Sequence, residues 1–369
     1  MKTTAAVATA ANADFTLAEI EVGMPGPGEV LVRIAGVGLC HTDLVFRDQI
    51  ADFAKPAVLG HEGAGVVEAV GEGVSAIAVG DRVVLGFSSC GACARCGEGL
   101  PSYCTQFVPL NYAGMRLEDG STAFTLDGVR LSSHFFGQSS FAMHTITRAA
   151  NVVKVGDSSV PLALMGPLGC GFQTGAGAVL RALDCQPGSA LVVFGGGPVG
   201  LAAVMAAKIR ECAAIVLVEP VAARRQIGLE IGATHAIDPR SGDLATSVRD
   251  IVPEGVDHAF DTTGRIEVIE AGLACLASHG VLGLVGVPAD LGAEVRFNLA
   301  NLITFGHRII GIIEGDSVPQ DLIPELLRLH AQGRFPFDRL ITSFPLNQIN
   351  EAVAAQHRGD CIKVVLVPD

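Results

Sequence analysis

LVVFGGGPVG, residues 191–200, joins a short apolar run to an alanine-rich segment at residues 201–209. This order predicts a strand, a tight turn and a helix. The turn fits the pattern G-x-G-x-x-G through Gly195, Gly197 and Gly200. In that pattern the first glycine permits the turn, the second lets a pyrophosphate approach the backbone, and the third lets helix and strand pack closely. The helix N-terminus adds free N–H groups and a positive dipole, so the stretch predicts a dinucleotide-binding unit.

A second apolar run, residues 214–218, ends in Glu219, which lies 19 residues after Gly200. A carboxylate at this place accepts hydrogen bonds from the ribose hydroxyls of the adenosine. Its charge would repel a 2′-phosphate, so NAD is favoured over NADP, although Arg224 and Arg225 follow and weaken that preference. Because the chain contains 45 glycines, the motif without this strand and acid would describe a glycine-rich turn with no ligand equally well.

The chain has 369 residues, enough for two domains, and its net charge of −13 argues against nucleic acid as a partner. The N-terminal residues 1–15 have no apolar core of the kind found in signal peptides, so we expect a cytoplasmic protein. Two uncharged stretches, 158–180 and 186–207, are interrupted by glycine and proline, so a membrane is not expected as a partner either.

The sequence pattern changes along the chain. Residues 30–154 contain short strand-like runs separated by turns and indicate a mostly antiparallel β domain. From about residue 172 strands alternate with helices, which predicts a doubly wound parallel sheet. The strands predicted there are 190–194, 215–219, 235–237, 256–261 and 281–285. A helix at 320–330, a proline-containing link and a last strand at 362–367 are expected to close the chain.

Four cysteines form a compact cluster with the spacing C-x2-C-x2-C-x7-C: Cys90, Cys93, Cys96 and Cys104. Four thiolates in a loop can make a closed tetrahedral site for a structural Zn²⁺. An iron–sulfur cluster shares the opening of this pattern, but its fourth cysteine usually comes sooner and precedes proline, whereas Thr105 follows here. Two disulfides are the other alternative, and a reducing compartment disfavours them.

Three further residues have the chemistry of an open metal site. Cys40, His61 and Cys170 would supply two thiolates and one imidazole and leave a fourth position for water or substrate. Each residue alone has an ordinary explanation, such as a buried core thiol or a turn histidine. Their spacing in the sequence does not bring them together.

A family resemblance does bring them together. GVGLCHTD (36–43), LGHEGAGVV (59–67), GDRVV (80–84), the four-cysteine segment, LGCGFQTGAGA (168–178) and the glycine pattern occur in one order. The whole chain thereby resembles the zinc-dependent, medium-chain alcohol dehydrogenases. The resemblance implies an α/β fold with two parts: a GroES-like, β-rich catalytic domain at 1–171 and 315–369, with a structural zinc lobe at about 90–104, and an NAD-binding Rossmann domain at 172–314. It also implies a homodimer or homotetramer with NAD and two zinc ions per subunit, one catalytic and one structural.

The resemblance also implies roles for individual residues. Cys40, His61 and Cys170 match the catalytic zinc ligands, Asp43 and Glu62 match residues beside them, and Thr42 matches the hydroxyl that takes the proton of the alcohol. The four clustered cysteines match the structural zinc ligands. Coenzyme positions are matched by His41, Gly195, Gly197, Gly200, Glu219, Arg224, Val287 and Lys363. One departure is Val45, which stands where many members have a histidine that ends the proton relay.

The substrate is expected to be a small alcohol or aldehyde. Phe87, Phe135 and Phe136 align with positions that line the substrate channel of animal-type relatives, and Ile313 would add apolar wall, although each could equally be a core residue. Segments 314–319 and 104–150 resemble bacterial aryl-alcohol (benzyl alcohol) dehydrogenases, so primary aromatic alcohols are favoured.

Three alternatives stay open. The first is an allylic terpenol such as geraniol. The second is a glutathione-dependent formaldehyde dehydrogenase, in which Arg116 and Arg130 would hold the carboxylates of glutathione. The third, a coenzyme-binding protein without catalysis, is disfavoured because the matched zinc ligands and Thr42 are all present.

Overall fold

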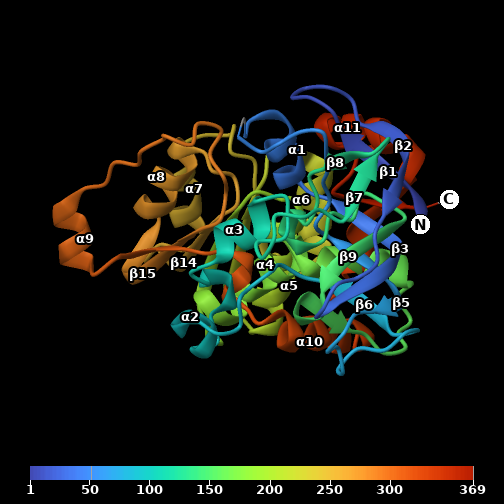
Figure 1. The fold of residues 1–369 in the computed structure, drawn as a ribbon. Coiled ribbons are helices and arrows are strands. Elements are labelled where there is room, and N and C mark those ends of the chain that lie inside the picture. The colour runs from blue at the N-terminus through green and yellow to red at the C-terminus, as the bar shows by residue number, and fades with distance from the viewer. Residues whose placement is uncertain (51, 369) are drawn as a thin grey trace. The chain divides into compact units, whose positions relative to one another are not determined.

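The computed structural model describes residues 1–50 and 52–368. The chain forms two compact units, and Figure 1 traces it through both by colour. The first unit contains Met1–Gly171, Val318–Ala331 and Phe337–Asp369, and the second contains Phe172–Ser317 and Gln332–Pro336.

The first unit is mostly β. Its strands are β1 (Lys2–Ala8), β2 (Thr16–Val22), β3 (Glu29–Leu39), β4 (Ala57–Val58), β5 (Gly63–Val70), β6 (Arg82–Leu85), β7 (Phe124–Leu126), β8 (Val129–Leu131), β9 (His144–Arg148), β10 (Val152–Lys154), β17 (Ile341–Pro345) and β18 (Lys363–Val367). Its helices are α1 (His41–Asp48), α2 (Ala94–Gly97), α3 (Phe107–Tyr112), α10 (Pro319–Ala331) and α11 (Ile349–Arg358).

Strand β3 organises this unit. One sheet has the order β4-β1-β2-β7-β8, and the other has the order β10-β6-β5-β3-β18-β17, with β9 also paired with β3. The end of β3 pairs with β18 through Val37, Gly38 and Leu39. The C-terminal strand of the chain therefore lies beside the backbone that leads directly into Cys40.

The second unit is an α/β layer structure. Its strands are β11 (Ala190–Phe194), β12 (Ala214–Val218), β13 (His235–Ile237), β14 (Val256–Asp261), β15 (Leu276–Leu284) and β16 (Arg308–Gly311). Its helices are α4 (Gly171–Gly177), α5 (Pro198–Ile209), α6 (Ala222–Ile231), α7 (Leu244–Ile251), α8 (Ile266–Ala274) and α9 (Leu299–Phe305).

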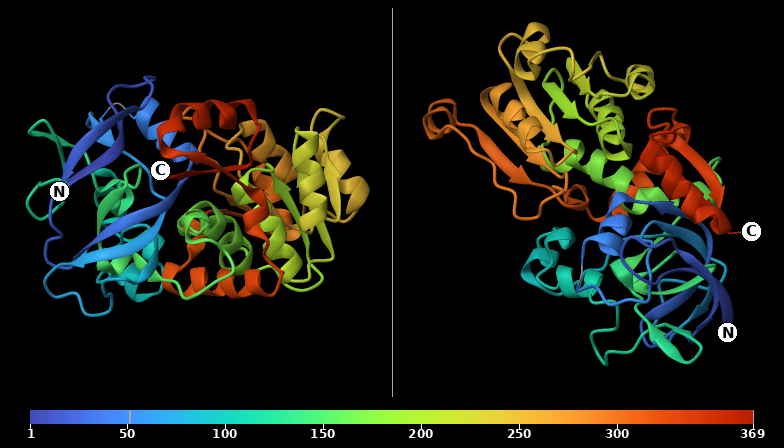
Figure 2. Two further views of the ribbon diagram at one scale, coloured as in Figure 1. Left: turned by 90° about the vertical axis from the view of Figure 1, so that its right-hand side faces the viewer. Right: turned by 90° about the horizontal axis from the view of Figure 1, so that it is seen from above.

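All strand pairs in this second sheet are parallel, in the order β13-β12-β11-β14-β15-β16, and Figure 2 shows the strands running side by side. The order reverses at β11, as in doubly wound sheets, where ligands bind outside the carboxyl ends of the strands. The sheet is held by a core of buried apolar side chains that includes Val192, Phe194, Val216 and Leu282. The predicted fold class is confirmed.

Several elements differ from the expectation. The alanine-rich β1 and its partner β2 were not identified, because alanine has low β-propensity. The expected link after α10 contains β17 and α11. Helix α5 begins at Pro198, three residues before the expected Leu201, because proline is favourable at the first position of a helix. Within the described residues no helix combines the length and the apolarity needed to span a bilayer.

Candidate metal centres and coenzyme site

Four potential ligands meet in the first unit. Cys40 follows β3, His61 and Glu62 precede β5, and Cys170 follows a 3₁₀ turn at Gly166–Gly169. One ligand atom from each of these residues lies within 4.8 Å of the others. The structure thus brings together residues that are far apart in the sequence.

The ring of His61 is oriented by a carboxylate. His61 is 1% exposed, and its Nδ1 lies 2.8 Å from Asp43 Oδ1. The same Asp43 accepts hydrogen bonds from the backbone N–H of Gly60 (3.1 Å) and Cys40 (2.9 Å). Because Asp43 accepts at Nδ1, the neutral ring carries its lone pair on Nε2. This buried Nε2 makes no hydrogen bond among the described residues, and it belongs to the cluster, so the site fits a metal ion.

The thiol of Cys40 is prepared for metal binding. A hydrogen bond with Cys170 outweighs the opposing effect of burial and, together with His61, holds the pKa of Cys40 well below its usual range. A thiolate is the form of cysteine that binds a metal. The hydroxyl of Thr42 is nearby, with Oγ1 at 3.7 Å from Cys40 Sγ. Val45 is buried on the same helix, α1, and offers no polar group.

Lys363 lies against this cluster. It is 2% exposed, and its Nζ donates to Glu62 Oε1 (2.6 Å) and to the carbonyl oxygen of Leu39 (3.1 Å). Burial raises the pKa of Glu62, and the positive charge of Lys363 opposes that rise. The ammonium group of Lys363 thus balances a buried carboxylate, whereas His41 is exposed at the start of α1. Their expected contact with a pyrophosphate stays a prediction.

The four clustered cysteines form a second site. One Sγ from each lies within 4.8 Å of the others, with separations that include 3.6 Å (Cys93–Cys96) and 4.0 Å (Cys90–Cys96). These are far longer than a disulfide bond of about 2.05 Å. Backbone N–H groups of Cys96 and Thr105 lower the pKa of Cys93 to about 5. The cage therefore suits a tetrahedral metal held by thiolates.

Aromatic rings cover His61. The ring of Phe136 stacks on it, with centroids 4.3 Å apart and planes at 20°, and Phe135 meets it edge-on at 5.5 Å. Phe87 lies against Phe107, at 5.7 Å. Other members of this cluster were not predicted from the sequence: Phe46, Phe53, Phe107 and Tyr112. The sequence could have indicated one of them: Phe46 lies four residues after Thr42 and therefore on the same face of α1.

The glycine turn of the second unit leaves space for a phosphate. Gly195 has a φ of +101°, and a Cβ on Gly200 would overlap the carbonyl oxygen of Gly195. A Cβ on Gly197 would meet no atom within 4 Å, so the backbone there is open to a ligand. The buried carboxylate of Glu219 accepts from the N–H of Gly196 (2.6 Å) and Val221 (2.8 Å). Each of its oxygens keeps a second lone pair for a ribose hydroxyl.

The other predicted residues of this unit lie around the same edge. Arg224 is half-buried on α6, which follows β12. Val287 is 48% exposed and follows β15, and the half-buried Ile313 follows β16. Since the strands are parallel, Val287 and Ile313 share the carboxyl edge of the sheet with Gly195 and Glu219.

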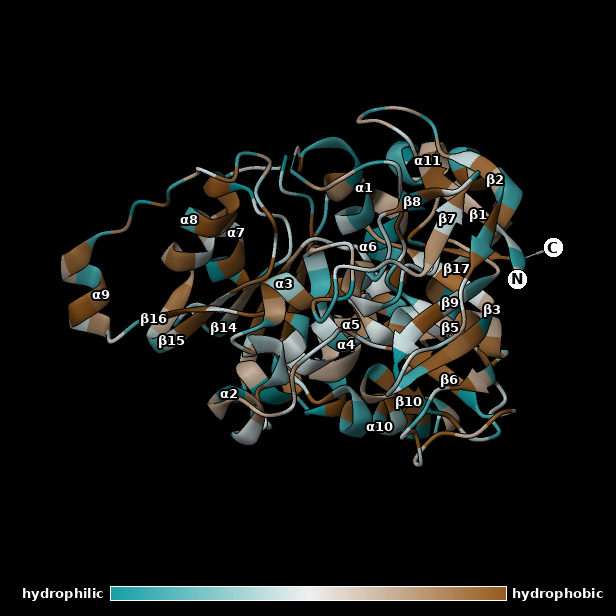
Figure 3. Cartoon of the chain, viewed as in Figure 1, coloured by the Kyte–Doolittle hydropathy of each residue, from teal (hydrophilic) through white to brown (hydrophobic). Residues whose placement is uncertain are grey.

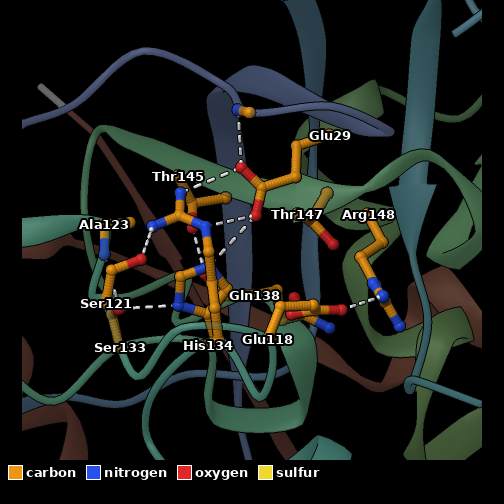
Figure 4. Close-up of polar contacts among 12 residues, drawn as sticks. Glu29, Glu118, Ser121, Ala123, Ser133, His134, Gln138, Thr145, Thr147 and Arg148 are labelled. Atoms are coloured by element: carbon orange, nitrogen blue, oxygen red, sulfur yellow. Dashed lines mark hydrogen bonds and ion pairs between the residues drawn. The ribbon is translucent and has the colours of Figure 1, made fainter. Parts of the chain in front are cut away.

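A partly buried ion pair in the first unit involves Arg116. Figure 4 shows Glu29 in this network, where it accepts hydrogen bonds from Arg116 Nε (2.7 Å) and Nη2 (2.9 Å) and from the N–H of Gly26 (2.7 Å). Burial would raise the pKa of Glu29, but the neighbouring His134 and Arg116 lower it to about 2. The charge of Arg116 is thereby paired with a carboxylate of the same chain, which weakens its expected role with glutathione. Arg130 is exposed on β8.

Comparison with known proteins supports the resemblance to alcohol dehydrogenases in both units. Residues 26–157 match the family model described as an alcohol dehydrogenase GroES-like domain, and residues 198–332 match the one described as a zinc-binding dehydrogenase. Geraniol dehydrogenase of Castellaniella defragrans is 48% identical over 364 residues, which are 98% of this chain and 97% of that protein.

Two solved structures are similar over the whole chain. The alcohol dehydrogenase zinc-binding domain protein of Burkholderia ambifaria has 48% identity and a TM-score of 0.97, and the match covers 100% of this chain and 99% of that one. The benzyl alcohol dehydrogenase of Acinetobacter calcoaceticus has 40% identity and a TM-score of 0.96, with 100% of both chains covered.

Proposed function

Because the chain belongs to the zinc-dependent, medium-chain alcohol dehydrogenase family, we propose that it interconverts primary aromatic (benzyl-type) alcohols and their aldehydes. The reaction is a hydride transfer to and from NAD. Zinc and NAD are the cofactors, and the substrate is a small molecule. The observation that carries the proposal is the aromatic cluster beside the open metal site, in which the ring of Phe136 stacks on His61. Aromatic side chains around a metal site favour flat, conjugated alcohols.

The residues of the site have separate roles in the proposed reaction. Cys40, His61 and Cys170 would hold the catalytic zinc, which polarises an alcohol or carbonyl oxygen when bound. Asp43 keeps the proton of His61 on Nδ1, so that Nε2 stays free to bind the metal. Thr42 Oγ1 would take the proton of the alcohol. Because Val45 cannot pass it on, the proton leaves through another group or through water.

The coenzyme is assigned to the second unit. Gly195, Gly197 and Gly200 would receive the pyrophosphate at the N-terminus of α5, and Glu219 would bind the adenosine ribose. The negative charge of Glu219 supports NAD over NADP. Val287 and Ile313 would contribute apolar surface near the nicotinamide.

Geraniol is the second candidate substrate. The 48% identity with a geraniol dehydrogenase supports it, and an allylic carbinol is conjugated as a benzylic one is. We would measure NADH formation with benzyl alcohol, geraniol and ethanol, each with NAD and with NADP. Fast turnover of benzyl alcohol with NAD and little turnover of ethanol is expected. If geraniol is preferred, the aromatic assignment is wrong but the stacking argument holds. A preference for ethanol would contradict both, and activity only with formaldehyde and glutathione would favour that alternative.

We also propose a homodimer or homotetramer, as the sequence suggests. Strand β16 lies at the edge of its sheet, and the preceding segment exposes apolar side chains: Phe297, Leu299 and Ile303 are 50%, 62% and 71% exposed. In Figure 3 much of the α9 ribbon has the colour of hydrophobic residues. Edge strands and apolar patches of this kind are usually covered by a partner. Light scattering of the wild type and of Ile303→Asp would test this, because a monomeric wild type contradicts it. The cytoplasmic location stays a prediction.

A further inference from the structure

Gln138 lies completely buried beside the metal ligand His61, and the reaction described above does not use it. Its side-chain amide makes all the hydrogen bonds it can make. Nε2 donates to the carbonyl oxygens of His61 (2.9 Å) and Gly86 (3.3 Å), while Oε1 accepts from the N–H of Gly63 (3.0 Å) and the hydroxyl of Ser140 (2.6 Å). A buried amide with four partners fixes the groups around it, because losing it would leave each of them unsatisfied.

The partners of Gln138 belong to three separate segments. His61 and Gly63 flank Glu62 in the turn that carries the metal ligand, and Gly86 directly precedes Phe87. Gln138 itself follows Phe136 by two residues, in the segment whose aromatic side chains cover His61. One side chain therefore ties the ligand turn to two segments that bear predicted substrate-lining phenylalanines.

These segments pack closely against each other. A Cβ on Gly63 would lie 2.5 Å from Ser140 Oγ, and one on Gly60 would lie 2.5 Å from Phe141 Cδ1. The N–H groups of Ser140 and Phe141 donate to the carbonyl oxygens of Gly60 (2.8 Å) and Leu59 (2.9 Å). The segment after Phe136 thus runs directly along the ligand turn.

The local backbone around Phe136 is held in an unfavourable conformation. His134, Phe136 and Ser139 have φ values of +60°, +50° and +56°, a backbone region that residues other than glycine rarely adopt. Such conformations persist only where surrounding contacts enforce them. Figure 4 shows His134 and Gln138 in this network, in which the Thr145 hydroxyl donates to the carbonyl oxygen of Gln138.

We infer that Gln138 is a positioning residue: it sets the place of the Phe136 ring relative to the His61 imidazole and thereby the selectivity for flat, conjugated alcohols. Asp43 holds the ring of His61, and Gln138 holds its backbone from the side of the aromatic segment. The inference rests on the proposed function. It adds that selectivity depends on a group that does not touch the substrate.

The test compares two buried polar residues of the same segment. Gln138→Met keeps the size of the side chain but removes all four hydrogen bonds. Ser139→Ala is the matched control. Ser139 is equally buried, and its hydroxyl accepts from the N–H of Phe135 (2.9 Å) and donates to the carbonyl oxygen of Val58 (2.6 Å). Neither of these two partners is His61 or Gly63. Both variants remove buried hydrogen bonds from the segment, whereas only Gln138→Met frees the ligand turn.

Two readouts separate positioning from a purely structural role. In Gln138→Met the ratio of kcat/KM for benzyl alcohol to that for ethanol should fall about tenfold or more, as expected for a displaced binding surface, and in Ser139→Ala it should stay close to wild type. With Co²⁺ in the catalytic site, the visible absorption bands should shift in Gln138→Met and not in Ser139→Ala, because they report the geometry of the ligands.

The inference would be overturned by an unchanged ratio and spectrum in Gln138→Met, or by equal changes in both variants. If Gln138→Met does not fold, Gln138→Glu keeps the shape and the acceptor half of the amide, and its selectivity should fall between wild type and the full loss. Wild-type protein that turns over no alcohol would contradict the proposed function instead, and the Co²⁺ spectra would still test the role of Gln138.

Discussion

Replacing Asp43 by asparagine should weaken the catalytic metal site without touching the structural one. Asp43 is fully buried and accepts three hydrogen bonds, from His61 Nδ1 and from the N–H groups of Gly60 and Cys40. Asparagine has one acceptor oxygen and one NH₂ group. If the oxygen serves His61 and Gly60, the NH₂ group faces the N–H of Cys40, and two donors oppose each other.

The size of the effect follows from this mismatch. A buried donor without an acceptor costs about 1–3 kcal/mol, which is roughly a 5- to 150-fold change in an equilibrium constant. Loss of a hydrogen-bond partner of a metal ligand typically costs about 10–100-fold in metal affinity or activity. The two values overlap, so we expect Asp43→Asn to bind the catalytic zinc about 10–100-fold more weakly.

The assay is the zinc content per chain after dialysis against increasing chelator, followed by kcat/KM with benzyl alcohol. Wild type should retain two zinc ions at chelator concentrations where Asp43→Asn retains one. Asp48→Asn is the matched control, because Asp48 ends the same helix and bonds Arg47 and the N–H of Asn12, away from the metal ligands. Equal zinc retention and equal activity in Asp43→Asn and wild type would refute the reasoning.

Three further changes test other parts of the structure. Glu29→Gln should lower the free energy of unfolding by about 2 kcal/mol at neutral pH, after allowance for solvent screening. Because the pKa of Glu29 is lowered from 4.5 to about 2, the stability difference from wild type should shrink as the pH falls below about 4.5. Denaturant unfolding would measure this difference, and a difference that does not depend on pH would contradict the prediction. Gly200→Ala should weaken NADH binding roughly fivefold or more, since the turn must move away from the new Cβ, and calorimetry showing wild-type affinity would count against the assigned site. Cys104→Ser should reduce the zinc content from two to one and lower the melting temperature, and a variant that still holds two zinc ions would exclude Cys104 as a ligand.

Local patterns predicted the second unit well. The strand, glycine turn and helix at 191–209 required only apolar periodicity and turn chemistry, and three predicted strands have the bounds of β11, β13 and β14. Short local signals failed elsewhere for physical reasons. Strand β1 is mostly alanine and threonine, and β17 ends in Pro345, so neither resembled a strand in the sequence.

The metal site depends on contacts that no local pattern contains. Cys170 comes 109 residues after His61, and only the family resemblance placed them together. The same holds for Gln138, which looks like an ordinary polar residue until its four partners are known. The burial of Lys363 against Glu62 was also unexpected, because a lysine is normally exposed. The domain boundaries and the roles of the site residues stay predictions.

The pairing of β18 with the end of β3 has a consequence for the order in which the protein matures. Lys363, which balances Glu62 beside the metal ligands, is 301 residues away from it along the chain. Synthesis proceeds from the N-terminus, so Cys40, His61 and Cys170 all leave the ribosome before this lysine is made. The four-cysteine lobe is complete by residue 104 and can acquire its zinc during translation. The catalytic centre, by contrast, reaches its final charge balance only after β18, which carries Lys363, has been made.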